Sequence, residues 1–427
     1  MQSKSNYRWA IVSLLFFATT INYLDRQVIG LLKDDLAKQF NWSEKDYGNI
    51  VMAFTGAYAA GLLFFGYFVD KIGTKLGYVI SIIVWSVAAM LHAVAGTTFG
   101  FGSARAALGI GEAGNFPVAI KTVAEWFPKK DRAFATGIFN SGSNVAAIAG
   151  PPLIAWIATS YGWQKAFLYT GALGFIWLIF WVIFYDTPTK QKRVSAEELA
   201  YINSDEQDIV TEDTNKVKWS MLLAIKQTWL FIVGKFFTDP VWYFYLFWIP
   251  SYFNTTYHLN ISKSAIHVST IYVAASLGSI FGGYLSGWFI KSGKPVYKAR
   301  KTAMLIFAFC VVPVIFVRYT SDIWFAVALV SLAAAAHQAW SANIFTTVSD
   351  MFPKKAVSSV VGIGSMAGAV GGILFPLFIG AVLDHFKNAG SIGIGYNIIF
   401  FICGVAYLIA WIIMHLLLPT MKKADIK

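Results

Sequence analysis

Several ionisable residues lie inside apolar runs of the sequence, where a charge is costly and needs a reason. Asp25 and Arg26 lie in "INYLDRQVIG", and Arg105 and Glu112 lie in "ARAALGIGEAGNFPVAIK". Arginine stays charged and presents a planar fork suited to a carboxylate. A buried aspartate or glutamate can take up and release a proton. These residue types together indicate a site that binds an anion and moves protons with it.

The spacing of Arg105 and Glu112 places them on one face of a helix. They are seven residues apart, which is two turns and about 10 Å along the axis. They therefore do not touch, and each needs a partner from another element. Two interpretations stay open: structural ion pairs that lock helices together, or binding and proton coupling.

Other polar side chains in apolar runs suit a polyol ligand. His337 can either make an interhelical hydrogen bond or meet substrate hydroxyls. With the two arginines, we predict these substrate-binding residues: Tyr23, Arg26, Tyr58, Arg105, Asn140, Asn144, Trp242, His337 and Gln338, with Ser141 beside them. Proton coupling is assigned to Asp25 and Glu112.

Lys235 and Asp239 form a separate charged pair. Their i,i+4 spacing lets them bond each other on one helix, directly before Pro240, which we expect to kink that helix. A structural or gating role is therefore favoured for this pair. Lys121 lies near the end of its run, where snorkelling to the headgroups explains it as well as substrate contact does.

The composition requires a membrane around these residues. The chain is 57% hydrophobic, 17% aromatic and 13% charged, with a mean hydropathy of +0.58, whereas soluble chains carry about 25% charged residues. Twelve apolar runs approach the length of about 20 residues that spans a bilayer. They fall near 9–32, 47–69, 76–97, 99–122, 134–157, 164–186, 229–253, 265–290, 302–318, 323–347, 357–383 and 396–418. The sequence therefore predicts an all-α membrane protein with twelve transmembrane helices.

The net charge of +12 could suggest nucleic-acid binding, but its distribution indicates topology instead. Lys and Arg concentrate in alternate connecting segments, including 129–132, 190–193 and 291–301. This positive-inside bias puts both termini in the cytoplasm. We therefore expect contact with the lipid bilayer and no nucleic-acid partner.

An internal repeat divides the chain. Residues 125–151, "EWFPKKDRAFATGIFNSGSNVAAIAGP", correspond to residues 350–376, "DMFPKKAVSSVVGIGSMAGAVGGILFP". Parallel repeats of this kind place substrate near the midplane between two halves. We predict six-helix bundles at 1–186 and 223–427, joined by a polar cytoplasmic linker at 187–222 with an amphipathic helix at 195–203.

A loop motif carries a family resemblance. "GYFVDKIGTK" supplies Gly66, Asp70, Lys71 and Gly73; glycines permit close turns and the aspartate can cap a neighbouring helix. The stretch resembles the loop motif of the major facilitator superfamily, G-x-x-x-D-[RK]-x-G-x-[RK], which implies the major facilitator fold and a gating role for these residues. The second copy, "GGYLSGWFIKSGK", is degenerate, with Gly287 where an acid would stand.

Longer stretches resemble one branch of that superfamily, the anion:cation symporters, and within it bacterial hexuronate transporters. They are "NYLDRQ", "ARAALGIGEAGNFPVAIKTVAEWFP", "GSNVAAIAGPPLIAWI", "DPVWYFYLFWIPSYF" and "HQAWSANIFTTVSDMF". The resemblance implies that Arg26 and Arg105 bind the substrate anion and that Glu112 and Asp25 handle protons. Asp25 is more similar to galactonate carriers, whereas Ser143 replaces a glutamine found in them.

The expected function is therefore proton-coupled uptake of a hexuronate, such as glucuronate or galacturonate, by a monomer in the bacterial inner membrane, without cofactor or metal. An aldonate symporter or an organic-anion exchanger on the same fold is the alternative. A cation or drug exporter would need acids uncompensated by the two arginines. An enzyme would need a nucleophile–base set or paired His or Cys ligands, and a sensor would need an appended domain longer than the linker.

Overall fold

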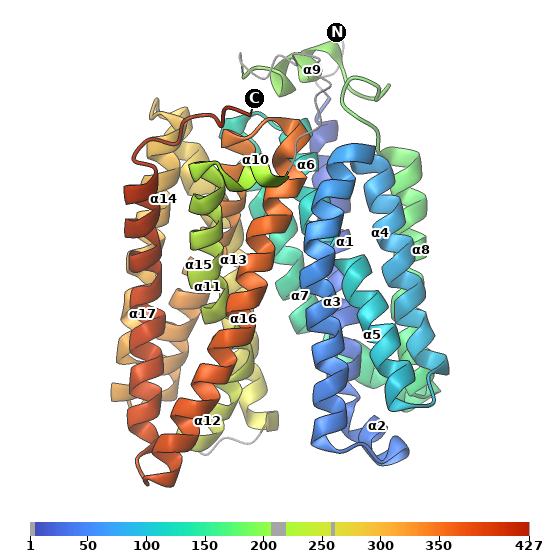
Figure 1. Ribbon diagram of the computed structural model, residues 1–427, viewed down its shortest axis with the longest axis vertical. Helices are drawn as coiled ribbons and strands as arrows, with labels where there is room; N and C mark the ends of the chain where they lie inside the picture. Colours follow the sequence, from blue (N-terminus) through green and yellow to red (C-terminus); the bar gives the residue numbers. More distant parts are fainter. Residues whose placement is uncertain (1–4, 206–218, 258–260, 427) are drawn as a thin grey trace. The chain divides into compact units, whose positions relative to one another are not determined.

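The chain folds into α-helices joined by short connections in the computed structural model, which describes residues 5–205, 219–257 and 261–426 (Figure 1). The segments are α1 (Tyr7–Leu31), α2 (Lys33–Phe40), α3 (Glu44–Ile72), α4 (Thr74–Leu91), η1 (His92–Val94), α5 (Thr98–Glu112), α6 (Asn115–Trp126), α7 (Lys129–Tyr161), α8 (Trp163–Phe184), α9 (Ala196–Ile202), α10 (Trp219–Leu223), α11 (Lys226–Phe247), α12 (Ile249–Tyr257), α13 (Ile261–Lys291), α14 (Val296–Val311), η2 (Val312–Tyr319), α15 (Ile323–Met351), η3 (Lys354–Ala356), α16 (Val357–Asn388) and α17 (Ile392–Leu417).

Two compact units divide the chain. Unit 1 comprises Met1–Lys129, Ile138–Val217 and Phe352–Met366, and unit 2 comprises Lys130–Gly137, Lys218–Met351 and Ala367–Lys427. Each unit therefore includes a short segment of a helix that otherwise belongs to the other unit. The first turns of α7 belong to unit 2, and the first turns of α16 belong to unit 1. The expected helix at 195–203 is confirmed as α9, while residues 206–218 of the expected linker lie outside the described residues.

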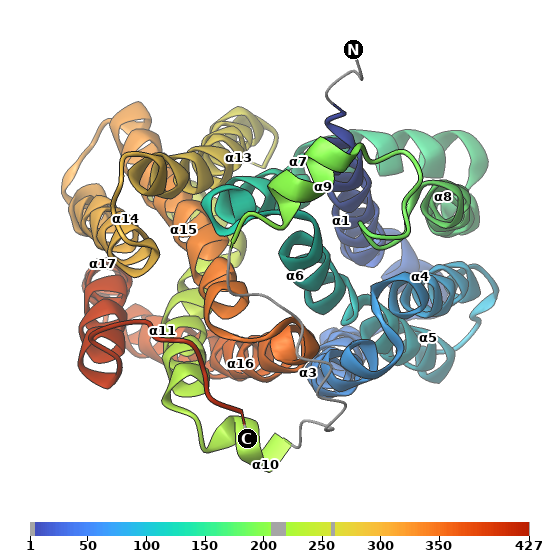
Figure 2. The ribbon, with the colours of Figure 1, turned by 90° about the horizontal axis from the view of Figure 1, so that it is seen from above.

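Unit 1 is built on α3, α4 and α5, which pack against one another, with α8 against α4 and α1 against α8. Figure 2 shows α6 beside α1 and α3, and it contacts both. Ser43 begins α3 with a capping box, in which its hydroxyl accepts from the backbone N–H of Asp46 and the Asp46 carboxylate accepts from that of Ser43. In unit 2, α15 packs against α13, α14 and α11, and α17 packs against α11.

The span expected at 99–122 is interrupted. It consists of α5 and α6, which are separated at Ala113 and Gly114. Small residues bring this break against α4, because a Cβ at Gly111 would lie 2.5 Å from the backbone nitrogen of Trp85. The Ser81 hydroxyl donates to the Gly111 carbonyl oxygen at 2.6 Å and satisfies it. The break therefore holds Glu112 at a fixed, buried position.

Eight of the described helices are long and apolar enough to cross a membrane by length and composition alone. Four other expected spans do not meet that criterion: α1, α5 with α6, α7, and α11 with α12. These segments carry most of the predicted polar and charged site residues. α5 and α6 fail the criterion on length, because they have 15 and 12 residues.

Candidate anion site

Arg26 and Glu112 form the centre of a charged cluster in unit 1. The Nε of Arg26 on α1 donates to Oε2 of Glu112 at the end of α5, at 2.9 Å, and the glutamate side chain has no exposed area. Arg105 lies two turns before Glu112 on the same face of α5, and its Nη2 donates to the Arg26 carbonyl oxygen at 2.9 Å. Arg105 and Glu112 therefore each find a partner on α1, as their spacing predicted.

Aromatic rings surround the two guanidinium groups. The Cζ of Arg26 lies 4.7 Å from the ring centre of Tyr23, 4.7 Å from that of Tyr58 and 5.1 Å from that of Phe54. The Cζ of Arg105 lies 5.1 Å from the same Phe54 ring. Sequence reasoning selected the two tyrosines but missed Phe54, although it precedes Tyr58 by four residues and so shares its helix face.

The cluster leaves hydrogen-bonding capacity unused. Among the described residues, Nε and Nη1 of Arg105 and Oε1 of Glu112 are buried and have no hydrogen-bond partner. Buried polar groups are normally satisfied, and an unsatisfied one costs about 1–3 kcal/mol. A ligand carboxylate is an acceptor that would satisfy the two Arg105 nitrogens.

Asp25 is not the partner of its neighbour Arg26. Only 1% of Asp25 is exposed, and its carboxylate has Thr170 of α8 as a polar neighbour. The ion pair of Arg26 goes to Glu112 instead. Asn22, one turn before Asp25 on α1, is also buried and has both side-chain polar atoms without a partner in the described part of the chain. Sequence reasoning did not select it.

The remaining predicted residues fall into both units. Asn140 and Asn144 are buried on α7 in unit 1, whereas Trp242 on α11 and the buried His337 and Gln338 on α15 belong to unit 2. The predicted i,i+4 pair is confirmed, since Nζ of Lys235 lies 2.7 Å from Oδ2 of Asp239.

The loop motif forms a helix cap within unit 1. The carboxylate of Asp70 accepts from the backbone N–H groups of Ser358 and Ser359 at 3.3 and 2.7 Å, which confirms the predicted capping role. Gly66 permits this approach, because a Cβ there would lie 2.6 Å from the Ser358 carbonyl oxygen. Gly73 joins α3 to α4 with a φ of 87°, and Lys71 is exposed.

Lys121 has a different role from either one expected. Its Nζ lies 2.8 Å from Oδ1 of Asp70, and the residue is only 5% exposed. It therefore neither snorkels to headgroups nor stands free for a substrate. The pair neutralises the Asp70 carboxylate that caps α16.

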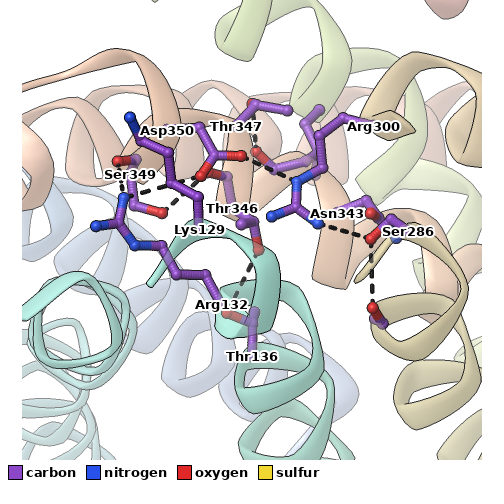
Figure 3. Close-up of polar contacts among 12 residues, drawn as sticks. Lys129, Arg132, Thr136, Ser286, Arg300, Asn343, Thr346, Thr347, Ser349 and Asp350 are labelled. Carbon is purple, nitrogen blue, oxygen red and sulfur yellow. Dashed lines mark hydrogen bonds and ion pairs between the residues drawn. The ribbon is translucent and has the colours of Figure 1, made fainter. Parts of the chain in front are cut away.

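A second arginine cluster lies in unit 2 (Figure 3). Asp350 at the end of α15 accepts from Nε of Arg300 at 2.9 Å and lies 3.8 Å from Nη1 of Arg132. Arg300 also donates to the Ser286 hydroxyl at 2.7 Å, and Arg132 donates to the Ser349 carbonyl oxygen at 2.6 Å. The sequence interpretation counted both arginines as cytoplasmic loop charges. It was wrong about their environment, because both side chains are at least 98% buried.

Residues 15–376 match the Major Facilitator Superfamily. The chain belongs to this superfamily. It is 32% identical over 389 residues to the hexuronate transporter of Escherichia coli (strain K12), covering 90% of this chain and 89% of that one. It is 34% identical over 286 residues to the galacturonate transporter of Dickeya chrysanthemi, covering 66% and 83%.

The solved structures agree on the fold. The proton:xylose symporter XylE, bound to 6-bromo-6-deoxy-D-glucose, superposes with a TM-score of 0.76 over 99% of this chain and 98% of that one, at 15% identity. The predicted all-α major facilitator fold of a multi-pass membrane transporter is thereby confirmed, as is the resemblance to hexuronate transporters.

Proposed function

We propose that this protein imports hexuronates, such as glucuronate or galacturonate, together with protons across the bacterial inner membrane. The observation that carries the proposal is the pair of buried, unsatisfied Arg105 nitrogens beside the Arg26–Glu112 ion pair. A uronate carboxylate fits them because it accepts hydrogen bonds and carries a charge opposite to that of the arginines. The names of the relatives, hexuronate and galacturonate transporters, support this substrate class.

Charge balance supports proton coupling. Two arginines and two ionised acids, Asp25 and Glu112, sum to zero in the unit 1 cluster. A bound carboxylate adds one negative charge, which is costly in a buried site unless it is compensated. Protonation of one acid restores neutrality, so substrate and proton stabilise each other's binding.

The other predicted residues complete the proposal. Tyr23, Tyr58, Asn140, Asn144, Trp242, His337 and Gln338 are assigned to the sugar hydroxyls and ring. Gly66, Asp70, Lys71 and Gly73 are assigned to gating, as is the Lys235–Asp239 pair. We assign the bundles to residues 1–186 and 223–427, place both termini in the cytoplasm, and take the monomer as the functional form.

The test is uptake of labelled glucuronate and galacturonate into proteoliposomes, with and without an inward proton gradient. Accumulation above equilibrium that requires the gradient is expected. Exchange that does not depend on the gradient would overturn proton coupling and make the protein an anion antiporter. Failure to take up either uronate, with galactonate carried instead, would overturn the substrate assignment.

A variant of Glu112 tests the coupling site. Glu112→Gln keeps a hydrogen-bond acceptor for Arg26 but cannot release a proton, so gradient-driven accumulation is expected to fall to the equilibrium level while exchange persists. Glu125→Gln is the matched control, since Glu125 on α6 is bonded to Thr74 and Tyr185 outside the cluster. If Glu112→Gln accumulated substrate normally, the coupling acid would lie elsewhere.

A further inference from the structure

Three aromatic side chains of unit 2 form a connected assembly. His337 on α15 stacks on the indole of Trp242 on α11, with ring centres 4.9 Å apart and planes 6° from parallel. The Nδ1 of His337 shares a hydrogen bond with the hydroxyl of Tyr407 on α17. That hydroxyl also lies 3.3 Å from the backbone carbonyl oxygen of Thr238, to which it donates.

This chain of hydrogen bonds fixes where the protons lie. Tyr407 has one hydroxyl proton, and the Thr238 carbonyl can only accept. Both contacts are satisfied together only if Tyr407 donates to the carbonyl and accepts from a protonated Nδ1. Tyr407 is fully buried and His337 is 4% exposed, so little water is available to offer a substitute partner.

The ring of His337 is neutral in this setting. An imidazolium would be a buried cation, and none of the ion pairs of the described residues gives it a carboxylate. A neutral ring with its proton on Nδ1 has a lone pair on Nε2. Among the described residues, the only hydrogen bond of the His337 ring is the one at Nδ1, so Nε2 can accept from a ligand.

We infer that Tyr407 is a positioning residue that holds His337 as the Nδ1–H tautomer, so that Nε2 accepts a hydrogen bond from a sugar-ring hydroxyl. The inference rests on the proposed uronate transport. It adds which partner donates and which accepts in one hydrogen bond to the substrate. A carboxylate cannot donate to Nε2, whereas each hydroxyl can. Trp242, which is partly exposed, offers the flat apolar surface on which the C–H face of a pyranose packs.

The tautomer can be measured without any substrate. The full chain, labelled with ¹⁵N-histidine and held in nanodiscs, gives signals from six histidines, and His337→Asn identifies the signal of His337. Long-range ¹H–¹⁵N correlations are expected to show a neutral ring protonated at Nδ1. A neutral ring protonated at Nε2, or an imidazolium, would overturn the inference.

Two variants test the role of the tyrosine hydroxyl. Tyr407→Phe removes the acceptor of Nδ1–H with almost no change in volume, and we expect mixed tautomers and about tenfold weaker glucuronate binding. Tyr245→Phe is the matched control, because its buried hydroxyl has no hydrogen-bond partner in the described structure; it should change neither readout. An unchanged tautomer and affinity in Tyr407→Phe would overturn the positioning role.

The two proposals fail in distinguishable ways. If the wild-type protein binds no glucuronate, the proposed function fails and the sugar contact fails with it, whereas the histidine spectrum still decides the tautomer. If glucuronate binds normally but His337 carries its proton on Nε2, the proposed function stands and the inference is wrong.

Discussion

Two clusters in this molecule each place two arginines around a paired carboxylate, and they differ in how completely the arginine nitrogens are bonded. Each contains two arginines around one paired carboxylate: Arg26 and Arg105 with Glu112 in unit 1, and Arg132 and Arg300 with Asp350 in unit 2. One carboxylate oxygen in each cluster, Oε1 of Glu112 and Oδ1 of Asp350, has no hydrogen-bond partner within the described structure. The nitrogens differ: no buried side-chain nitrogen of Arg132 or Arg300 lacks a partner there, whereas Nε and Nη1 of Arg105 both lack one.

We interpret the difference as the one between a structural ion pair and the proposed binding site. Burial of an arginine is common to both clusters and so does not by itself indicate function. The unsatisfied donors of Arg105 are the distinguishing feature, because a fold that leaves them unbonded is destabilised unless a ligand fills the gap.

Removing the acid of the unit 2 cluster should have the largest effect on stability. Asp350→Asn leaves Arg132 and Arg300 buried without a counter-charge, and we expect a loss of about 3 kcal/mol in the free energy of unfolding. Thermal unfolding in detergent measures it. Asp384→Asn, which changes an exposed acid on α16, is the control. Equal melting temperatures for the two variants would contradict a structural role for this cluster.

Removing the Phe54 ring, which contacts both Arg26 and Arg105, should weaken glucuronate binding. We expect this effect to be smaller than the loss of stability in Asp350→Asn. Phe54→Leu deletes two cation–π contacts worth about 1 kcal/mol together, so glucuronate affinity should fall about fivefold. Phe65→Leu makes the same change at a buried position of the same helix and should leave affinity intact. Isothermal titration of both variants decides the matter, and equal affinities would remove Phe54 from the site.

The smallest effect is expected at a saturated carboxylate outside the membrane. Burial alone would raise the pKa of Glu198, but hydrogen bonds from the Ser5 hydroxyl and from the backbone N–H groups of Tyr7 and Arg8 outweigh it and lower that pKa below 4.5. Glu198→Gln should cost about 1 kcal/mol at neutral pH, comparable to the loss of a helix cap.

The stabilisation by Glu198 should depend on pH in one direction. A carboxylate whose pKa is lowered by folding stabilises the folded state above its ordinary pKa, and this stabilisation is lost as the pH falls through the lowered value. The difference in melting temperature between wild type and Glu198→Gln should therefore shrink in acid. A difference that grew in acid would contradict the capping of α1 by Glu198.

Much of the fold and part of the site could be predicted from the sequence. The membrane helices follow from apolar runs, the capping role of Asp70 follows from the loop motif, and the Lys235–Asp239 pair follows from its i,i+4 spacing. Partners on different helices could not be predicted: Arg26 pairs with Glu112, 86 positions away, rather than with the adjacent Asp25. Charge counting placed Arg132 and Arg300 in loops, because it cannot tell a buried helix end from an exposed connection.

The most direct test is glucuronate binding to purified wild type, Arg105→Lys and Arg300→Lys, measured together with their melting temperatures. Lysine keeps the charge but cannot reach the Arg26 carbonyl and also present donors to a ligand. We expect Arg105→Lys to melt like wild type and bind at least about thirtyfold more weakly, a loss of about 2 kcal/mol. We expect Arg300→Lys to melt lower and, where folded, to bind normally. Wild-type affinity in Arg105→Lys would contradict the assignment of the anion site.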